Sequence, residues 1–128
     1  MIPDAIDLII HHLLQNDYLN ESRFAQALSR GKFRTKKWGR IRIIRELKLR
    51  DISKYNIDLA LKEIPEDEYY STFHELAEKR FRQLNLYSPD GSSVKSLQKK
   101  RKKLADYLLY RGWESGLVWE KVRELFSY

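Results

Sequence analysis

Cysteine is absent from this sequence of 128 residues, and glycine and proline are scarce, with five and three residues. Without cysteine the chain can form no disulfide framework, no thiolate nucleophile and no cysteine-based zinc site. Few helix-breaking residues are typical of a chain that is mostly helical. No apolar run is long enough to span a bilayer, and the opening residues, with Asp4 and Asp7, lack the basic start of a signal peptide. We therefore predict a helical protein of the cytoplasm.

Charge, by contrast, is abundant and unevenly distributed. The net charge is +7, yet residues 30–50 alone contain ten basic residues and one acidic residue, Glu46, a balance of +9. A second basic block at residues 99–103 has no acidic residue, and residues 58–78 between the two are rich in acidic ones. This segregation predicts attraction to a polyanion. The alternative is that both blocks are solvated helix faces, on which Arg42 and Glu46 are spaced to form an ion pair.

Apolar residues recur three and four positions apart, which predicts amphipathic helices and no convincing strand. We expect seven helices, and start and stop signals give their boundaries. The first covers Ile6 to Leu14, the second starts at Asn20 and ends between Gly31 and Thr35, the third starts between Lys37 and Gly39, and the fourth is capped by Ser53 and ends before Pro65. The fifth starts at residues 66–68 and is followed by a turn at residues 88–91, the sixth ends at Gly112 and the seventh starts at Glu114. Four residues of the third expected helix should share one buried side: Ile41, Ile43, Ile44 and Leu47.

Part of the sequence repeats after 61 positions. Eight residues then meet an apolar, aromatic or identical partner: Ile43 with Leu104, Leu47 with Leu108, Leu49 with Tyr110, Arg50 with Arg111, Ile52 with Trp113, Ile57 with Val118, Leu61 with Val122 and Ile64 with Leu125. Two helices and their connecting turn are therefore repeated, and Trp113, at an apolar position, is predicted to be buried. An earlier helix matches at an offset of 57, where Arg23-Phe24 meets Arg80-Phe81.

The repeated unit is a helix-turn-helix-like set of three helices. Because such a unit buries little surface alone, neighbouring units should stack. We predict an all-α fold of tandem three-helix repeats that stack into an elongated, curved body. Residues 1–17 would be the last helix of an incomplete first repeat, residues 18–65 the second repeat and residues 66–128 the third.

Three stretches, in this order, resemble signatures of the RecX family, the regulatory proteins of the RecA recombinase filament. They are Tyr18-Leu19-Asn20-Glu21-Ser22-Arg23-Phe24-Ala25, Gly39-Arg40-Ile41-Arg42-Ile43-Ile44-Arg45-Glu46-Leu47 and Tyr107-Leu108-Leu109-Tyr110-Arg111-Gly112-Trp113. The resemblance covers nearly the whole chain from Ile6 onward. The sequence departs from the family pattern at Asn20, where an acidic residue is common, and at Asp51, which replaces a helix-ending glycine. Aspartate can adopt the left-handed backbone that glycine adopts there, at some cost.

The resemblance implies an all-helical, crescent-like body that lies in the groove of a RecA–DNA filament and restrains ATP hydrolysis and strand exchange, or shortens filaments. We expect a monomer that modulates, by inhibition, the ATPase, recombinase and coprotease activities of the filament. The RecA filament would be the partner, with DNA contacted directly or within the filament, and no cofactor would be needed. The candidate contact residues are Trp38 and the cations of the two basic blocks, namely Lys32, Arg34, Lys36, Lys37, Trp38, Arg40, Arg42, Arg45, Lys99, Lys100, Arg101, Lys102 and Lys103. The cations would pair with carboxylates or phosphates, and Trp38 could stack on a base.

Two other functions fit the same residues. A direct DNA-binding protein would insert Arg40, Arg42 and Arg45 into the major groove, as a helix-turn-helix does. A helical adaptor would carry its basic faces for solvation alone. Arg23 and Arg111 match family motif positions, but they can equally clamp helix ends.

The residues needed for catalysis or metal binding are missing. The sequence has no glycine-rich phosphate loop, no nucleophile elbow and no constellation of paired acids. His11, His12 and His74 lack the spacing of metal ligands. We therefore predict that the chain is not an enzyme and that it holds neither a metal nor a cofactor.

Overall fold

The computed structural model of the protein describes residues 20–87 and 94–127. Within these ranges a helical segment at residues 20–31 continues as a π-helical turn, η1 (Lys32–Lys36), and is followed by α2 (Arg40–Leu49), α3 (Lys54–Lys62), α4 (Glu66–Tyr87), α5 (Val94–Tyr110) and α6 (Ser115–Leu125). No strand occurs in this part of the chain, so the all-α prediction is confirmed. The expected helix at Ile6–Leu14, the assignment of residues 1–17 to an incomplete repeat and the turn at residues 88–91 lie outside the described residues.

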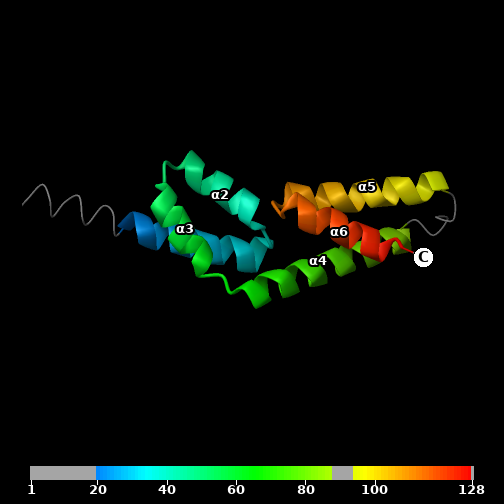
Figure 1. The fold of residues 1–128 in the computed structure, drawn as a ribbon, viewed down its shortest axis with the longest axis horizontal. Coiled ribbons are helices and arrows are strands. Elements are labelled where there is room, and N and C mark those ends of the chain that lie inside the picture. Colours follow the sequence, from blue (N-terminus) through cyan, green and yellow to red (C-terminus); the bar gives the residue numbers. More distant parts are fainter. Residues whose placement is uncertain (1–19, 88–93, 128) are drawn as a thin grey trace, which may run out of the picture.

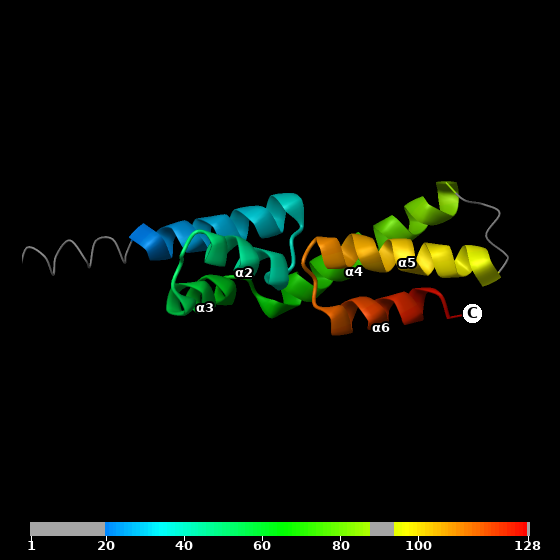
Figure 2. The same cartoon turned by 90° about the horizontal axis from the view of Figure 1, so that it is seen from above.

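The helices form two consecutive three-helix units along an elongated body (Figure 1). We call residues 20–64, with the first helix, α2 and α3, the N-terminal unit, and residues 66–126, with α4, α5 and α6, the C-terminal unit. The two units lie end to end in both views, and α4 runs from the middle of the body beneath α5 and α6 (Figure 1, Figure 2). The predicted tandem arrangement of three-helix repeats is therefore confirmed.

The α2–α3 and α5–α6 pairs repeat at the predicted offset of 61. Ile43 and Leu47 are fully buried in α2, as Leu104 and Leu108 are in α5. Ser53 caps α3 as expected, because its side chain accepts a hydrogen bond from the backbone N–H of Asn56. The same apolar positions thus build the core of both units.

The turn within each pair has one backbone conformation, a Schellman motif. Asp51, with φ of 58°, and Gly112, with φ of 92°, both adopt the left-handed backbone that ends the preceding helix. One residue further on, a backbone N–H returns to the helix, from Ile52 to the Leu47 carbonyl at 3.1 Å and from Trp113 to the Leu108 carbonyl at 3.3 Å. Asp51 therefore adopts the helix-ending, left-handed conformation for which the family usually has glycine.

The first helices of the two units repeat at an offset other than 57, so that prediction is wrong. Phe24 is 44% exposed, whereas Phe81 packs against the core. Burial instead agrees at a separation of 48 positions: Ala25 with Phe73, Leu28 with Leu76, Ser29 with Ala77 and Phe33 with Phe81. Because the second and third helices repeat after 61 positions, the C-terminal unit has the longer connection between its first and second helices.

The first helix also extends beyond its predicted end. It continues through η1 to Lys36 and stops at Lys37, whose φ of 57° is left-handed. Phe33 is buried within η1, and this contact with the core holds the extra turn in place. Gly31 lies inside the helix and does not end it.

An aromatic cluster joins the two units. The ring of Trp113, which is buried as predicted, lies 4.6 Å from that of Tyr69, 5.2 Å from that of Phe73 and 6.5 Å from that of Phe33, measured between ring centroids. Phe33 belongs to the N-terminal unit and the other three rings to the C-terminal unit. Large aromatic side chains contribute much of the energy of a core, so this cluster fixes one unit against the other.

Candidate binding surface

The start of α2 is capped by the C-terminal unit. The N–H groups in the first turn of a helix have no partner within that helix. Here the N–H of Gly39 donates to the Arg111 carbonyl at 2.8 Å, that of Arg40 to the Tyr69 hydroxyl at 2.9 Å and that of Ile41 to the Gly112 carbonyl at 2.9 Å. The α5–α6 turn and α4 thus supply the hydrogen-bond acceptors that the first N–H groups of α2 lack within their own helix.

The end of the first helix is capped from the same side. The Arg111 guanidinium donates to the carbonyl of Lys36, and the Trp113 indole N–H donates to the carbonyl of Lys37 at 3.2 Å. Of the two roles open to Arg111, the structure therefore shows the helix clamp. Arg23 is exposed on the first helix.

Two glycines allow this close approach. A Cβ on Gly39 would lie 2.6 Å from the Cα of Trp113, and a Cβ on Gly112 would lie 2.8 Å from the Cα of Arg42. Two carbon atoms that are not bonded clash at both distances, so neither position has room for a side chain. Gly112 needs glycine for a second reason, since its φ of 92° is unfavourable for other residues.

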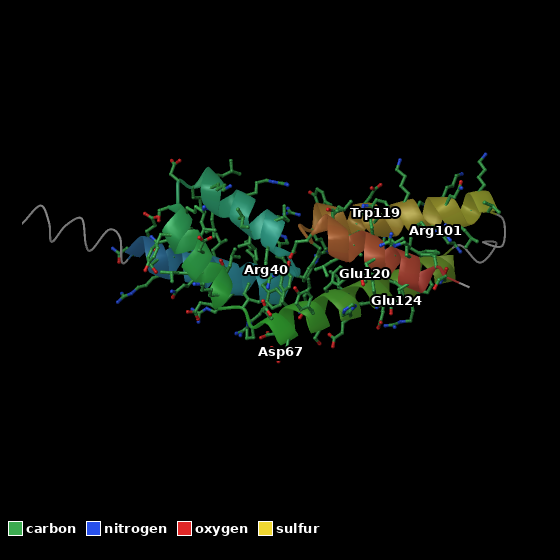
Figure 3. The ribbon with its side chains drawn as sticks, in the orientation of Figure 1. Arg40, Asp67, Arg101, Trp119, Glu120 and Glu124 are labelled. Atoms are coloured by element: carbon green, nitrogen blue, oxygen red, sulfur yellow. The ribbon has the colours of Figure 1, made fainter. Side chains whose placement is uncertain are left out.

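We call the contact between the two units, made by Arg40, Tyr69, Arg111, Gly112 and Glu114, the joint. Arg40 lies inside this joint (Figure 3). Its side chain is 22% exposed, forms an ion pair with Glu114 at 3.3 Å and stacks 3.9 Å from the centre of the Tyr69 ring. The Tyr69 hydroxyl donates to the other Glu114 oxygen. Burial, together with this hydrogen bond, raises the pKa of Tyr69 well above its ordinary value. The charge of Arg40 is therefore largely neutralised within the protein.

Cations and aromatic rings alternate along the surface beside the joint. The Lys32 ammonium lies 5.0 Å from the centre of the Trp38 ring, and the Arg42 guanidinium lies 4.3 Å from Trp38 and 4.7 Å from the ring of Tyr110. Arg42 also donates to the Tyr110 carbonyl at 3.2 Å. We call these four residues the cation–aromatic row. Tyr110 is 74% exposed, and sequence analysis missed it as a contact residue although it belongs to the third family motif.

The outer face of α2 forms a shallow groove of about 550 Å³, lined by Ile41, Ile44, Arg45, Lys48 and Leu49. Ile41 is 44% exposed and Leu49 is 74% exposed, so the prediction that Ile41 lies on the buried side is wrong. Helical spacing places Ile41 about 200° around α2 from the fully buried Ile43, so the two side chains lie on nearly opposite sides of the helix. Arg45 is exposed, as a contact residue should be.

The remaining cations of the first basic block differ in their surroundings. Lys36 and Lys37 have exposed side chains, and Arg34 forms an exposed ion pair with Glu68 at 3.7 Å. Glu46 pairs with Arg50 and not with Arg42, contrary to the sequence prediction. The hydrogen bond from Arg50 lowers the pKa of the Glu46 carboxyl.

The second basic block lies on α5 and consists mainly of exposed lysines. Lys99, Lys102 and Lys103 are exposed, whereas Lys100 is buried and its ammonium donates to the Asn85 side chain at 3.3 Å. Arg101 is exposed, and its guanidinium donates to the Phe126 carbonyl at 3.3 Å (Figure 3). The structure thus separates the predicted contact residues into two surfaces, one on η1 and α2 and one on α5.

No group of three or more histidine, cysteine, aspartate or glutamate side chains in residues 20–87 and 94–127 could hold a metal ion. Over the same ranges, no helix has both the length and the apolar character that crossing a membrane demands. His74 is exposed on α4, and His11 and His12 lie outside the described residues.

Tandem three-helix units with exposed cationic and aromatic surfaces define a helical binding protein. Two family models match the chain, that of the RecX second three-helix domain over residues 20–61 and that of the RecX third three-helix domain over residues 66–122. The chain therefore belongs to the RecX family.

One curated relative is the Regulatory protein RecX of Clostridium acetobutylicum, which is 28% identical to this chain over 124 residues. The alignment covers 95% of this chain and 54% of that protein, so the chain spans about half the length of the relative. No solved structure matches the chain.

Proposed function

We propose that this chain binds the RecA–DNA filament and inhibits its ATPase, recombinase and coprotease activities. Membership of the RecX family and the regulatory relative support a role in RecA regulation. The observation that carries the proposal is the cation–aromatic row, which runs from Lys32 in the N-terminal unit to Tyr110 in the C-terminal unit. Exposed cations on both units of an elongated body suit a long, negatively charged partner such as a nucleoprotein filament.

We assign filament contact to the exposed cations and to the row. Two predicted contact residues instead serve the fold, because Arg40 is paired with Glu114 and Lys100 is buried beside Asn85. DNA would be contacted within the filament, through the exposed lysines of α5. The chain would act as a monomer.

Direct reading of DNA by α2 is the less favoured function. Such a helix must present several side chains to the base edges of the major groove. Arg40 and Arg42 are held by contacts to Glu114 and Tyr110, and Arg45 alone of the three predicted arginines is exposed.

The experiment that tests the proposal is DNA-dependent ATP hydrolysis by the cognate RecA, measured with increasing amounts of this chain. Binding of the chain to the same DNA without RecA is measured in parallel. We expect ATP hydrolysis to be suppressed at substoichiometric to equimolar amounts, with weak binding to naked DNA. Tight DNA binding without any effect on RecA would instead identify a direct DNA-binding protein.

Charge reversal on α2 tests the surface. The R45E/K48E variant should lose most of the suppression, because both side chains are exposed on α2. The matched control is K54E/K62E, which makes the same change of charge at two exposed lysines of α3. Equal loss in both variants would show that net charge alone, and not the α2 surface, governs binding.

A further inference from the structure

The groove on α2 has different chemistry at the corresponding positions of α5. At the repeat offset of 61, Ile41 corresponds to Lys102 and Arg45 to Asp106 on α5. Both of these α5 residues are exposed and charged. The repeat therefore keeps the buried side of the two helices, while these two outer positions are isoleucine and arginine on α2 and lysine and aspartate on α5.

The chemistry of the groove combines two features. Ile41 and Leu49 stay exposed on α2, separated by about two helical turns or ~12 Å, and Arg45 and Lys48 line the same groove. Exposed apolar side chains favour an apolar partner surface. The two cations favour carboxylates, which arginine can bind with two parallel hydrogen bonds.

We propose that this groove binds an acidic amphipathic helix of a partner protein. The apolar side of that helix would cover Ile41, Ile44 and Leu49, and its flanking carboxylates would pair with Arg45 and Lys48. Anchors at positions i, i+3 or i+4 and i+7 span about 10 Å along a helix, which matches the distance from Ile41 to Leu49. The inference rests on the proposed function in that it names the kind of element the filament would present to this surface.

The groove suits a protein and not a phosphate backbone. A surface that only neutralises phosphates needs cations and gains nothing from exposed isoleucine and leucine. The exposed lysines of α5 fit that description: a second groove, of about 400 Å³, lies beside Arg101 and Trp119, and its lining does not include Lys99, Lys102 or Lys103. Apolar side chains with arginine at the centre are instead characteristic of interfaces between proteins.

The test uses the full chain and a fluorescein-labelled helical peptide of about 18 residues, with leucines at i, i+3, i+4 and i+7 and glutamates on the flanks. A second peptide has lysine in place of every glutamate, and a third has serine in place of every leucine. We expect saturable binding of the first peptide by fluorescence anisotropy, and at least about tenfold weaker binding of the other two, which corresponds to ~1.4 kcal/mol. Equal binding of the acidic and basic peptides would overturn the proposal.

Substitutions in the chain locate the site. The I41S/L49S variant should bind the acidic peptide at least about tenfold less tightly, and its circular dichroism should match the wild type because both side chains are exposed. The control V94S/W119S removes two exposed apolar side chains of the C-terminal unit and should retain peptide binding. Equal losses in the two variants would overturn the assignment to the groove.

Two other occupants are tested with the same I41S/L49S variant. If the wild type forms a concentration-dependent dimer in sedimentation experiments and the variant does not, the groove binds a second copy of the chain and the proposal is wrong. If the variant loses affinity for an oligonucleotide while peptide binding persists, the groove is a nucleic-acid site and the proposal is again wrong.

The RecA assay separates this inference from the proposed function. Peptide binding at the groove without any effect on RecA would support the inference and contradict the proposed function. Suppression of RecA without peptide binding would support the function and overturn the inference.

Discussion

The two units share their helical frame and differ in where they place charge. In the N-terminal unit, cations alternate with aromatic and apolar side chains along η1 and α2, as in the contacts of Arg42 with Trp38 and Tyr110. In the C-terminal unit the ring contacts are made by arginines, as by Arg101 with Phe126, and within the described residues none is made by the exposed Lys99, Lys102 or Lys103 of α5. A repeated fold therefore conserves buried positions and turns, while each outer face is free to acquire its own chemistry.

The two units also differ in charge inside the core, where one buried position is alanine in the N-terminal unit and lysine in the C-terminal unit. Ala60, fully buried in α3, corresponds at the offset of 61 to Lys121, which is 4% exposed in α6. The Lys121 ammonium lies 3.0 Å from a Glu78 oxygen and 3.3 Å from a Glu124 oxygen. The two glutamates stay partly exposed, so hydration of their carboxylates offsets part of the cost of burying the lysine.

The largest expected effect follows from breaking the joint between the units. Gly112→Ala should destabilise the protein by about 2–5 kcal/mol, since it adds left-handed strain to a clash with Arg42. Urea unfolding measures this change. The control is Gly31→Ala, because a Cβ at Gly31 meets no atom within 4 Å, and alanine inside a helix should be neutral or stabilising by up to ~1 kcal/mol. Similar results for the two variants would contradict the close packing at Gly112.

A smaller effect should separate two arginines of α2. Arg40→Ala removes the contacts to Glu114 and Tyr69 and should cost about 1.5–3 kcal/mol of stability, as expected for hydrogen bonds to charged groups. Arg45→Ala should change stability by less than about 0.5 kcal/mol, yet weaken the effect on RecA. Urea unfolding and the ATPase assay on both variants test this. Loss of RecA suppression without loss of stability in Arg40→Ala would show that Arg40 is a contact residue.

The lysines of α5 should determine how binding to naked DNA depends on salt. On duplex DNA the slope of log affinity against log salt changes by about 0.9 for each phosphate contact. The K102Q/K103Q variant should therefore flatten the slope by about 1.8 if both exposed lysines contact phosphates. The R45Q/K48Q variant should leave the slope unchanged, because we assign those cations to a protein partner. Equal flattening in both variants would remove the distinction between the two basic surfaces.

The smallest expected effect concerns acid stability. The hydrogen bond and charge of Lys121 lower the pKa of Glu78 below its ordinary value of 4.5. This contribution to stability is thus fully present above pH 4.5 and is lost as the pH falls through the lower pKa of the folded state. Lys121→Met should reduce this loss, with a change in stability at pH 7 within about 1 kcal/mol in either direction. The midpoint of urea unfolding, measured from pH 7 to pH 3 for the wild type and the variant, gives this acid dependence of stability. The same dependence in both proteins would contradict the role of the Lys121–Glu78 pair.

Local patterns sufficed for much of the fold. Apolar spacing and turn residues predicted the all-helical class, the 61-residue repeat, the burial of Trp113 and the left-handed Asp51. The helical class and the turns depend on residues within about one helical turn of one another, so the sequence records them directly. The repeat is visible as a recurrence of the same pattern, and the burial of Trp113 followed from its place in that repeat. The offset of the first helix was predicted wrongly because identical side chains at Arg23-Phe24 and Arg80-Phe81 concealed a different pattern of burial.

The tertiary structure alone decided which charged side chains reach solvent. Arg40 and Arg45 belong to one basic run, yet the first is enclosed by Glu114 and the second is exposed. Such outcomes depend on which part of a helix a distant segment covers, here a partner 74 positions away from Arg40. Helical periodicity fixes the direction of a side chain from its own axis, but only the packing of the second unit against the first fixes what that side chain meets.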